Sequence, residues 1–282
     1  DKSQVEIRVA FCFPDTYEIG MSNVGMRILY GIMNNMEGVW CERAFAPWGD
    51  MEEEMRSHHL PLWTLESHDP LEEFDVIAFS LGYEMAYSNV LNMLELGNIP
   101  LRSCDRGDSL KHLVIAGGTS VYNPEPMADF LDICIEGEGE DVDVELLECY
   151  RSAKRRGLSR HEFLLEAAKI PGIYVPSLYE HTYNDDGTIR EIIPLEGAPK
   201  IVTKRIVQDM DAAYYPTETI VPSTQIVHDR TVLELFRGCI RGCRFCQAGF
   251  CYRPVRPKSP ERLYEIAVKS LENSGYDEMT LS

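Results

Sequence analysis

Three cysteines near the C-terminal end of the sequence carry its most specific chemical signal. Cys239, Cys243 and Cys246 follow a C-x3-C-x2-C spacing within the segment FRGCIRGCRFC. Compact spacing on a loop lets three thiolates converge on one face of a metal centre, and the intervening glycines permit tight backbone turns. Three ligands leave one iron of a four-iron cluster open, and an open position lets a metal centre bind a small molecule. The spacing therefore predicts a 4Fe-4S cluster with one free iron.

A zinc site is the main alternative for these thiols, with Cys251 as a fourth ligand. Structural zinc sites generally combine two short-spaced ligand pairs, whereas His228 is isolated and no second Cys/His pair lies nearby. A simple electron-transfer cluster is a further alternative. Four arginines near the thiols could lower thiolate pKa values or meet a carboxylate or a polyanionic substrate, or form only a solvated basic loop. They are Arg241, Arg244, Arg253 and Arg256.

Composition sets broad limits on the remaining chemistry. Nine cysteines, an odd number with uneven spacing, favour metal binding and buried thiols over a disulfide framework. A net charge of −19 argues against broad attraction to nucleic acid or anionic membranes. No apolar run approaches the roughly 18 residues of a membrane span, and we expect a cytoplasmic protein. The isolated cysteines are expected to be core or surface thiols: Cys12, Cys41, Cys104, Cys134 and Cys149.

Strands and helices alternate along the first 157 residues. This alternation predicts a doubly wound, Rossmann/flavodoxin-like parallel sheet in an α/β domain over residues 1–157. The expected strands lie at 5–13, 44–46 (weak), 76–80, 113–116 and 133–135, and the expected helices at 22–36, 51–58, 86–96 and 141–155.

The rest of the chain is predicted to form a linker and a second unit. Residues 158–229 are a helical and β-hairpin linker, with the hairpin over 172–194 and an Asp-Gly turn. In residues 230–282, a strand at 231–236 precedes a helix that begins after Ser259 and stops at Gly275, and a second strand follows. These elements cannot bury their own faces, so we expect the N-terminal fragment of a larger, truncated β/α barrel.

The cysteine segment resembles the radical S-adenosylmethionine (radical SAM) superfamily. In that family the loop after the first barrel strand carries this spacing, with an aromatic residue just before the third cysteine, as Phe245 stands here. The resemblance implies that the open iron binds S-adenosylmethionine and that the reduced cluster cleaves it to methionine and a 5′-deoxyadenosyl radical. It also implies a reductant such as flavodoxin or ferredoxin as partner. This chain alone is expected to be inactive, because most of the barrel is missing.

A second resemblance lies between the first strand and the first helix, where open α/β sheets bind ligands. The loop 13–25, FPDTYEIGMSNVG, resembles the D-x-H-x-x-G loop of cobalamin-binding domains, with Asp15 and Gly20 in register. Tyr17 stands in place of the histidine, which in that family is the lower axial ligand to cobalt and is held by the aspartate. The resemblance therefore implies either cobalamin bound without a histidine or a domain that kept the fold and lost the cofactor.

Further glycine and serine positions extend this resemblance over nearly the whole chain. Ser80 ends one strand, Gly117 and Gly118 end another, and in the cobalamin family they would lie beside the nucleotide tail. Turn and helix-cap chemistry alone is the alternative for such positions, including the GEGE segment 137–140. Bound cobalamin would imply methyl transfer to carbon or phosphorus; without it, hydrogen abstraction or methylthio transfer is expected. The substrate class, a small molecule or RNA, stays open.

Overall fold

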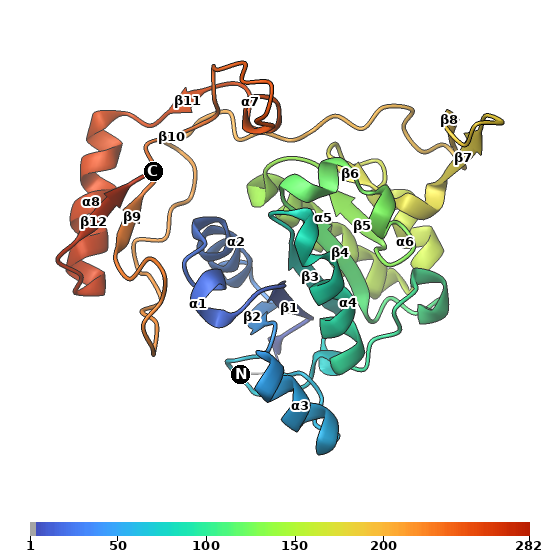
Figure 1. The fold of residues 1–282 in the computed structure, drawn as a ribbon, viewed down its shortest axis with the longest axis horizontal. Coiled ribbons are helices and arrows are strands. Elements are labelled where there is room, and N and C mark those ends of the chain that lie inside the picture. The colour runs from blue at the N-terminus through green and yellow to red at the C-terminus, as the bar shows by residue number, and fades with distance from the viewer. Residues whose placement is uncertain (1–3) are drawn as a thin grey trace.

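A six-stranded sheet forms the centre of the protein. The computed structural model describes residues 4–282. Strand order is β2-β1-β3-β4-β5-β6, with β1 to β5 parallel and β6 antiparallel to β5 (Figure 1). The order of the first five strands is that of flavodoxin-like sheets, which confirms the predicted doubly wound α/β fold. The bounds are β1 Ile7–Phe13, β2 Val39–Phe45, β3 Val76–Ser80, β4 Leu113–Gly117, β5 Ile133–Ile135 and β6 Ile173–Tyr174.

Helices cover both faces of this sheet. Alternate residues of β1 enter two separate apolar clusters, Val9 and Phe11 on one face and Ala10 and Cys12 on the other, so the strand is apolar throughout. The first face is covered by α2 (Val24–Asn34), α5 (Gly139–Arg156) and α6 (Arg160–Ala167), and the second by α3 (Gly49–Ser57) and α4 (Tyr87–Leu96).

Several one-turn helices join these elements. They are α1 (Tyr17–Gly20) and the 3-10 helices η2 (Leu71–Glu73), η3 (Glu84–Ala86), η4 (Ser103–Arg106), η5 (Thr119–Tyr122), η6 (Glu125–Met127) and η7 (Pro176–Leu178). No helix in the described part of the chain has the length and apolar character needed to cross a membrane.

Strand β2 is longer than its sequence predicts. Only residues 44–46 were expected to be extended, because Glu42 and Arg43 interrupt the apolar pattern. In the fold Glu42 is fully buried, and its carboxylate accepts hydrogen bonds from the hydroxyls of Thr64 (2.5 Å) and Ser67 (2.7 Å). Partners some 20 residues away thus satisfy a charged group that argued against a strand.

The C-terminal part begins with a hairpin and an extended segment. Strands β7 (Tyr179–Tyr183) and β8 (Ile189–Pro194) pair antiparallel, which confirms the predicted hairpin for residues 179–194. Its predicted start at residue 172 is wrong, because Ile173 and Tyr174 form β6 and pair with β5 of the main sheet. From residue 195 to 230 the chain forms no helix and no extended strand. It is held to the sheet at one backbone bridge, Gly137 with Arg205, which continues the line of β5.

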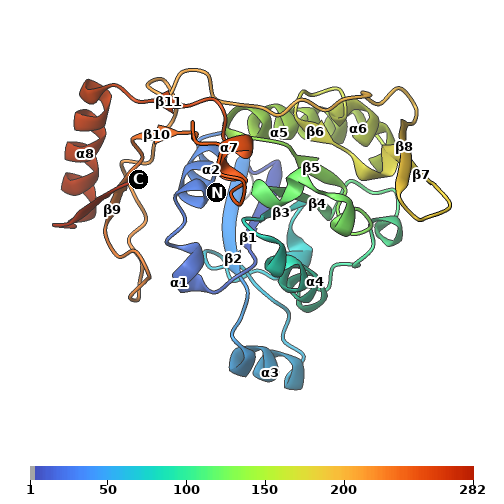
Figure 2. The same cartoon turned by 45° about the horizontal axis from the view of Figure 1, so that its top comes forward.

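A parallel βαβ unit follows and packs beside α2 (Figure 2). It consists of β9 (Thr231–Leu233), α8 (Pro260–Ser274) and β12 (Met279–Leu281), and β9 pairs with β12. Helix α8 begins at Ser259, whose hydroxyl accepts the N–H of Arg262, and ends at Gly275 in the left-handed region, as predicted. Inside the unit, β10 (Phe236–Arg237) pairs with β11 (Arg256–Pro257), and α7 (Ala248–Cys251) lies between them.

The start of β5 depends on a buried carboxylate. Asp132 lies 2.9 Å from one guanidinium nitrogen each of Arg106 and Arg160, and it accepts the backbone N–H of Val114 at 2.7 Å. These contacts attach η4 and α6 to the edge of the sheet that leads into β5.

We expect Asp132→Ala to lower the free energy of unfolding by about 3–5 kcal/mol, because two buried guanidinium groups lose their counterion. Urea denaturation measures the change. Asp129→Ala is the matched control: its pair with Arg102 is exposed, so a loss below about 1 kcal/mol is expected. Equal losses in the two variants would show that burial of Asp132 is energetically unimportant.

Candidate functional site

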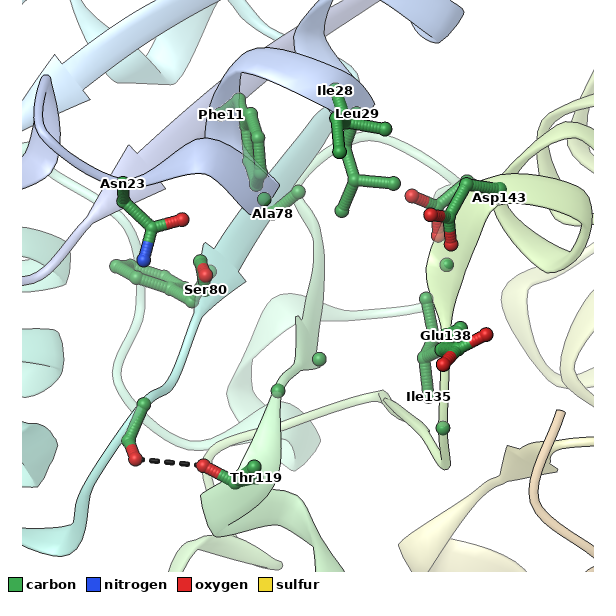
Figure 3. A pocket seen from close by; sticks show the side chains of 18 of the residues that line it. Phe11, Asn23, Ile28, Leu29, Ala78, Ser80, Thr119, Ile135, Glu138 and Asp143 are labelled. Carbon is green, nitrogen blue, oxygen red and sulfur yellow. Dashed lines mark hydrogen bonds between the residues drawn. The ribbon is translucent and has the colours of Figure 1, made fainter. Parts of the chain in front are cut away.

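A cavity of about 520 Å³ lies between the sheet, α2 and α5 (Figure 3). It extends along one face of the sheet from Val76, the first residue of β3, to the carboxyl ends of the parallel strands, the edge at which open α/β sheets bind ligands. Its size is that of a cofactor pocket. The sheet supplies the floor, α2 and α5 supply two walls, and the segment around β10 supplies a further wall through Glu234, Phe236, Arg237 and Gly238.

The floor of the pocket is apolar and small. Val76, Ala78 and Ser80 line it from β3, because alternate side chains of a strand point to one face. Ile77, between them, packs into the core on the opposite face. The short Ala78 side chain leaves room in the middle of the floor.

Two predicted glycines border the pocket for different reasons. Gly118 has a φ of +107°, and a Cβ there would lie 2.4 Å from the carbonyl oxygen of Leu81, so the fold itself requires glycine. A Cβ on Gly117 would come no closer than 3.7 Å to its neighbour Ile135. Gly117 is therefore the position where absence of a side chain leaves space for a ligand.

Polar groups lie at the strand-end edge of the pocket. Asn23 caps α2 by accepting the N–H of Met26 at 2.9 Å, and its side chain lies on the same side of the pocket as Ser80 (Figure 3). The Thr119 hydroxyl donates to the carbonyl of Gly82 at 2.7 Å. Asn23 and Ser80 thus present unused hydrogen-bonding capacity to a bound group.

Asp143 on α5 lies opposite Leu29 of α2 at the other end of the pocket (Figure 3). Its side chain is 8% exposed. Burial raises the pKa of Asp143 to about 8, with a further contribution from the charge of Glu140. The Cys41 thiol also faces it, and the carboxyl forms no hydrogen bond or ion pair within residues 4–282. Asp143 is thus protonated at neutral pH.

A group of ion pairs joins the pocket edge to the cysteine segment. Glu138 accepts hydrogen bonds from both terminal nitrogens of Arg256, at 2.7 and 2.6 Å, and from the backbone N–H of Val207. Arg237 pairs with Glu140 at 2.5 Å. Burial acts to raise the pKa of Glu138, but the bonds from Arg256 and Val207 and the charge of Arg237 lower it overall. The carboxylate therefore stays ionised and holds the two arginines.

The cysteine loop, residues 238–255, is closed by the β10–β11 pair, and side chains hold its C-terminal limb. The Lys204 ammonium donates to the carbonyls of Phe250, Cys251 and Arg253 at 3.3, 2.9 and 2.8 Å. The Tyr122 hydroxyl donates to the carbonyl of Cys251 at 3.2 Å. These bonds fix the loop against the carboxyl end of the sheet.

The predicted cluster ligands lie on this loop. Cys243 is exposed, Cys239 and Cys246 are half-buried, and Phe245 is 94% exposed. Within residues 4–282 no three His, Cys, Asp or Glu side chains are already gathered around one metal position. Of the isolated cysteines, Cys104 is exposed, Cys149 is half-buried, and Cys12, Cys41 and Cys134 are buried thiols with raised pKa, as expected for core positions.

The residues of the 13–25 loop that were expected to touch a cofactor do not line the pocket. Asp15 accepts the Tyr83 hydroxyl at 2.6 Å. Tyr17 packs edge-on against Phe45, and its hydroxyl accepts the N–H of Ser223 at 3.1 Å. Gly20 is packed so closely that a Cβ would lie 2.2 Å from the Phe45 ring. A role of Asp15, Tyr17 and Gly20 in cofactor binding stays a prediction.

The predicted site omitted Asn23, Glu138, Asp143 and Arg237. A signal for Asp143 exists: it follows Val142 and precedes Leu146 on the buried stripe of α5, where an acidic residue is unusual. The sequence pattern identifies Asn23 as a helix cap, but a capping residue does not by itself indicate a pocket. The pairing of Glu138 with Arg237 has no local signal, because the two residues are about 100 positions apart.

The sequence match to a family model defines the class of this protein. Residues 25–176, more than half of the chain, match the family model for the N-terminal region of radical SAM proteins. The chain belongs to that family.

One curated relative is similar in sequence, and solved structures are similar in fold. The uncharacterized protein MJ0966 of Methanocaldococcus jannaschii is 25% identical over 97% of this chain, and the chain spans 48% of that relative's length. The solved radical SAM methyltransferase TsrM of Kitasatospora setae, with cobalamin and a [4Fe-4S] cluster bound, is similar in fold, with a TM-score of 0.53 at 12% identity over 98% of this chain and 47% of TsrM. TsrM with tryptophan substrate and the SAM analog aza-SAM gives a TM-score of 0.51 at 11% identity, over 98% of this chain and 47% of that one.

The raised pKa of Asp143 predicts a pH-dependent stability difference. From about pH 4 to 8 the folded protein keeps a proton on Asp143 that the unfolded chain has lost, so stability falls as pH rises. We expect the free energy of unfolding of Asp143→Asn, relative to that of the wild type, to increase by up to about 1.4 kcal/mol per pH unit between pH 5 and 7. Urea denaturation at both pH values tests this. Glu136, whose pKa burial raises to about 7, is present in both proteins and cancels. Parallel stability curves would show that Asp143 is ionised.

Proposed function

We propose that this chain is part of a cobalamin-dependent radical SAM enzyme, with the cobalamin tail in the 520 Å³ pocket and a 4Fe-4S cluster on Cys239, Cys243 and Cys246. One observation carries the proposal. Arg237 and Gly238 line the pocket, and Cys239 is the next residue of the chain. The pocket and the cysteine loop therefore share a wall, so two cofactors held there lie side by side.

The pocket has the chemistry that a nucleotide tail requires. Its apolar floor accepts an aromatic base, the space beside Gly117 admits close approach, and Asn23 and Ser80 offer polar groups at the edge. The fold similarity to TsrM, which was solved with cobalamin and a [4Fe-4S] cluster, supports this assignment. No imidazole stands at position 17, and Tyr17 is engaged by Ser223, so the proposal includes no protein histidine on the cobalt.

The loop residues fit a three-thiolate cluster. Cys239, Cys243 and Cys246 would hold it, and none of their thiols is locked inside a core. When bound, the cluster supplies the electron for reductive cleavage of S-adenosylmethionine. The chain's own contribution is position: Arg237 and Arg256 hold the base of the loop through Glu138 and Glu140, and Lys204 holds its C-terminal limb.

The proposed reaction is methyl transfer to a carbon or phosphorus centre of a small molecule or RNA. An external reductant such as flavodoxin or ferredoxin would supply the electron. A zinc-binding module on Cys239, Cys243, Cys246 and Cys251 and a plain electron-transfer protein are the competing functions, and metal analysis separates them from the proposal.

We expect anaerobic reconstitution of the full-length protein to give about four irons per chain, following the three-thiolate cluster assignment. The reduced cluster's electron paramagnetic resonance signal should change when S-adenosylmethionine is added. Cys239→Ala, Cys243→Ala and Cys246→Ala should each abolish iron binding, whereas Cys104→Ala, an exposed cysteine elsewhere, should retain it.

Each competing function gives a distinct result in that experiment. One zinc per chain with no visible absorbance would favour the binding module. A cluster that ignores S-adenosylmethionine would favour electron transfer. Unchanged iron content in the three alanine variants would reject these cysteines as ligands.

We expect Ala78→Leu to abolish cobalamin binding, because the larger side chain extends from the floor into the pocket. The free energy of unfolding should stay within about 1 kcal/mol of the wild type, since the added methyl groups enter open space. A visible-absorbance titration with methylcobalamin measures binding.

Ala116→Leu is the matched contrast, since Ala116 is fully buried on the opposite, close-packed face of the same sheet. There we expect a loss of about 1–3 kcal/mol from overpacking, with cobalamin binding retained by the folded fraction. Full cobalamin affinity in Ala78→Leu would place the cofactor outside this pocket.

A further inference from the structure

Four carboxyl groups line the pocket, and they differ in one respect. Glu138 and Glu140 pair with Arg237 or Arg256, and Glu234 pairs with Arg237 at 2.8 Å and with Lys258 at 2.7 Å. Asp143, the fourth, has no ion pair or hydrogen bond within the described residues. It is also more than nine-tenths buried. Three of the four side-chain carboxyl groups are therefore paired within the protein, whereas Asp143 lines the pocket without such a partner among the described residues.

The surroundings of Asp143 restrict what can satisfy it. Burial keeps the carboxyl protonated at neutral pH, so it offers one O–H donor. Leu29, Leu146 and Leu147 line the same region and offer no polar side-chain atom. A ligand group that matches these surroundings is therefore largely apolar and carries an acceptor atom for this donor. An amide does not fit, because its N–H groups would be left without acceptors. An aromatic ring nitrogen with a free lone pair fits.

We propose that Asp143 donates a hydrogen bond to the free ring nitrogen of the aromatic base at the end of the bound corrinoid's tail, and that the pocket thereby selects corrinoids that carry such a base. The inference rests on the proposed function and names the group that recognises the cofactor's tail. Asp143 is a specificity residue in this assignment. It does not take part in the chemistry at the cluster.

The test compares two corrinoids that differ only in the tail. Methylcobalamin carries a benzimidazole base, and methylcobinamide lacks the nucleotide and the base. Equilibrium dialysis with the full-length protein in dim light gives both dissociation constants. We expect the wild type to prefer methylcobalamin, and Asp143→Leu to reduce that preference about three- to tenfold, the effect of one buried hydrogen bond. Affinity for methylcobinamide should not change.

Two further variants complete the comparison. Asp143→Asn keeps an N–H donor and should retain most of the preference. Glu145→Gln is the matched control on the same helix, because Glu145 pairs with Arg205 at 2.8 Å and does not line the pocket; it should behave as the wild type. Should Asp143→Leu fail to fold, Asp143→Ala removes the carboxyl without adding volume and carries the same expectation.

The outcomes separate this inference from the function on which it rests. Equal preference for methylcobalamin in the wild type and in Asp143→Leu or Asp143→Ala would overturn the role of Asp143 while the cofactor assignment stands. Binding of neither corrinoid by the wild type would overturn the proposed cofactor and this inference together. A tenfold fall in methylcobinamide affinity in the variants would show a general structural effect and reject specificity.

Discussion

The carboxylate of Glu138 joins the two halves of this protein. Glu138 follows β5 at the carboxyl edge of the sheet. Its carboxylate accepts hydrogen bonds from two nitrogens of Arg256, a residue 118 positions later in the chain. Such a bidentate pair fixes orientation as well as distance. Because Arg256 begins β11 and β11 pairs with β10, this one carboxylate sets where the cysteine loop leaves the sheet. The shared wall of pocket and loop depends on that geometry.

Burial makes this ion pair costly to break. Glu138 and Arg256 have side chains only 12% and 9% exposed, so loss of either partner would leave the other as an uncompensated, largely buried charge. Neighbouring Gly137 adds a steric constraint, because its φ of +109° brings its backbone so close to Arg205 that a Cβ would lie 2.1 Å from the Arg205 carbonyl oxygen. Charge and close packing thus attach linker, sheet and loop at two consecutive residues, Gly137 and Glu138.

Sequence patterns predicted the framework of the site better than its contacts. The limits of β3 and β5 match the prediction because both strands are short apolar runs with polar flanks. Ser80 and Gly117 were singled out by the resemblance to cobalamin-binding domains, and both line the pocket. Strand β2 was largely missed because Glu42 is satisfied by Thr64 and Ser67, which no local pattern reveals. Asp143 and the Glu138–Arg256 pair depend on which helices and loops meet in space, and spacing along one sequence does not contain that information.

The loop 13–25, which resembles a cobalamin-binding loop in sequence, contacts the linker in this structure. Tyr17 directs its hydroxyl to the N–H of Ser223, and the Ser22 hydroxyl accepts the N–H of His228, so this loop holds the linker at two points. A phenol extends farther than an imidazole from the same backbone position and can reach a neighbouring segment. The linker that Tyr17 contacts leads directly into β9 and the cysteine loop. The position that would supply a cobalt ligand in the cobalamin family is therefore used here to hold the chain that carries the thiols.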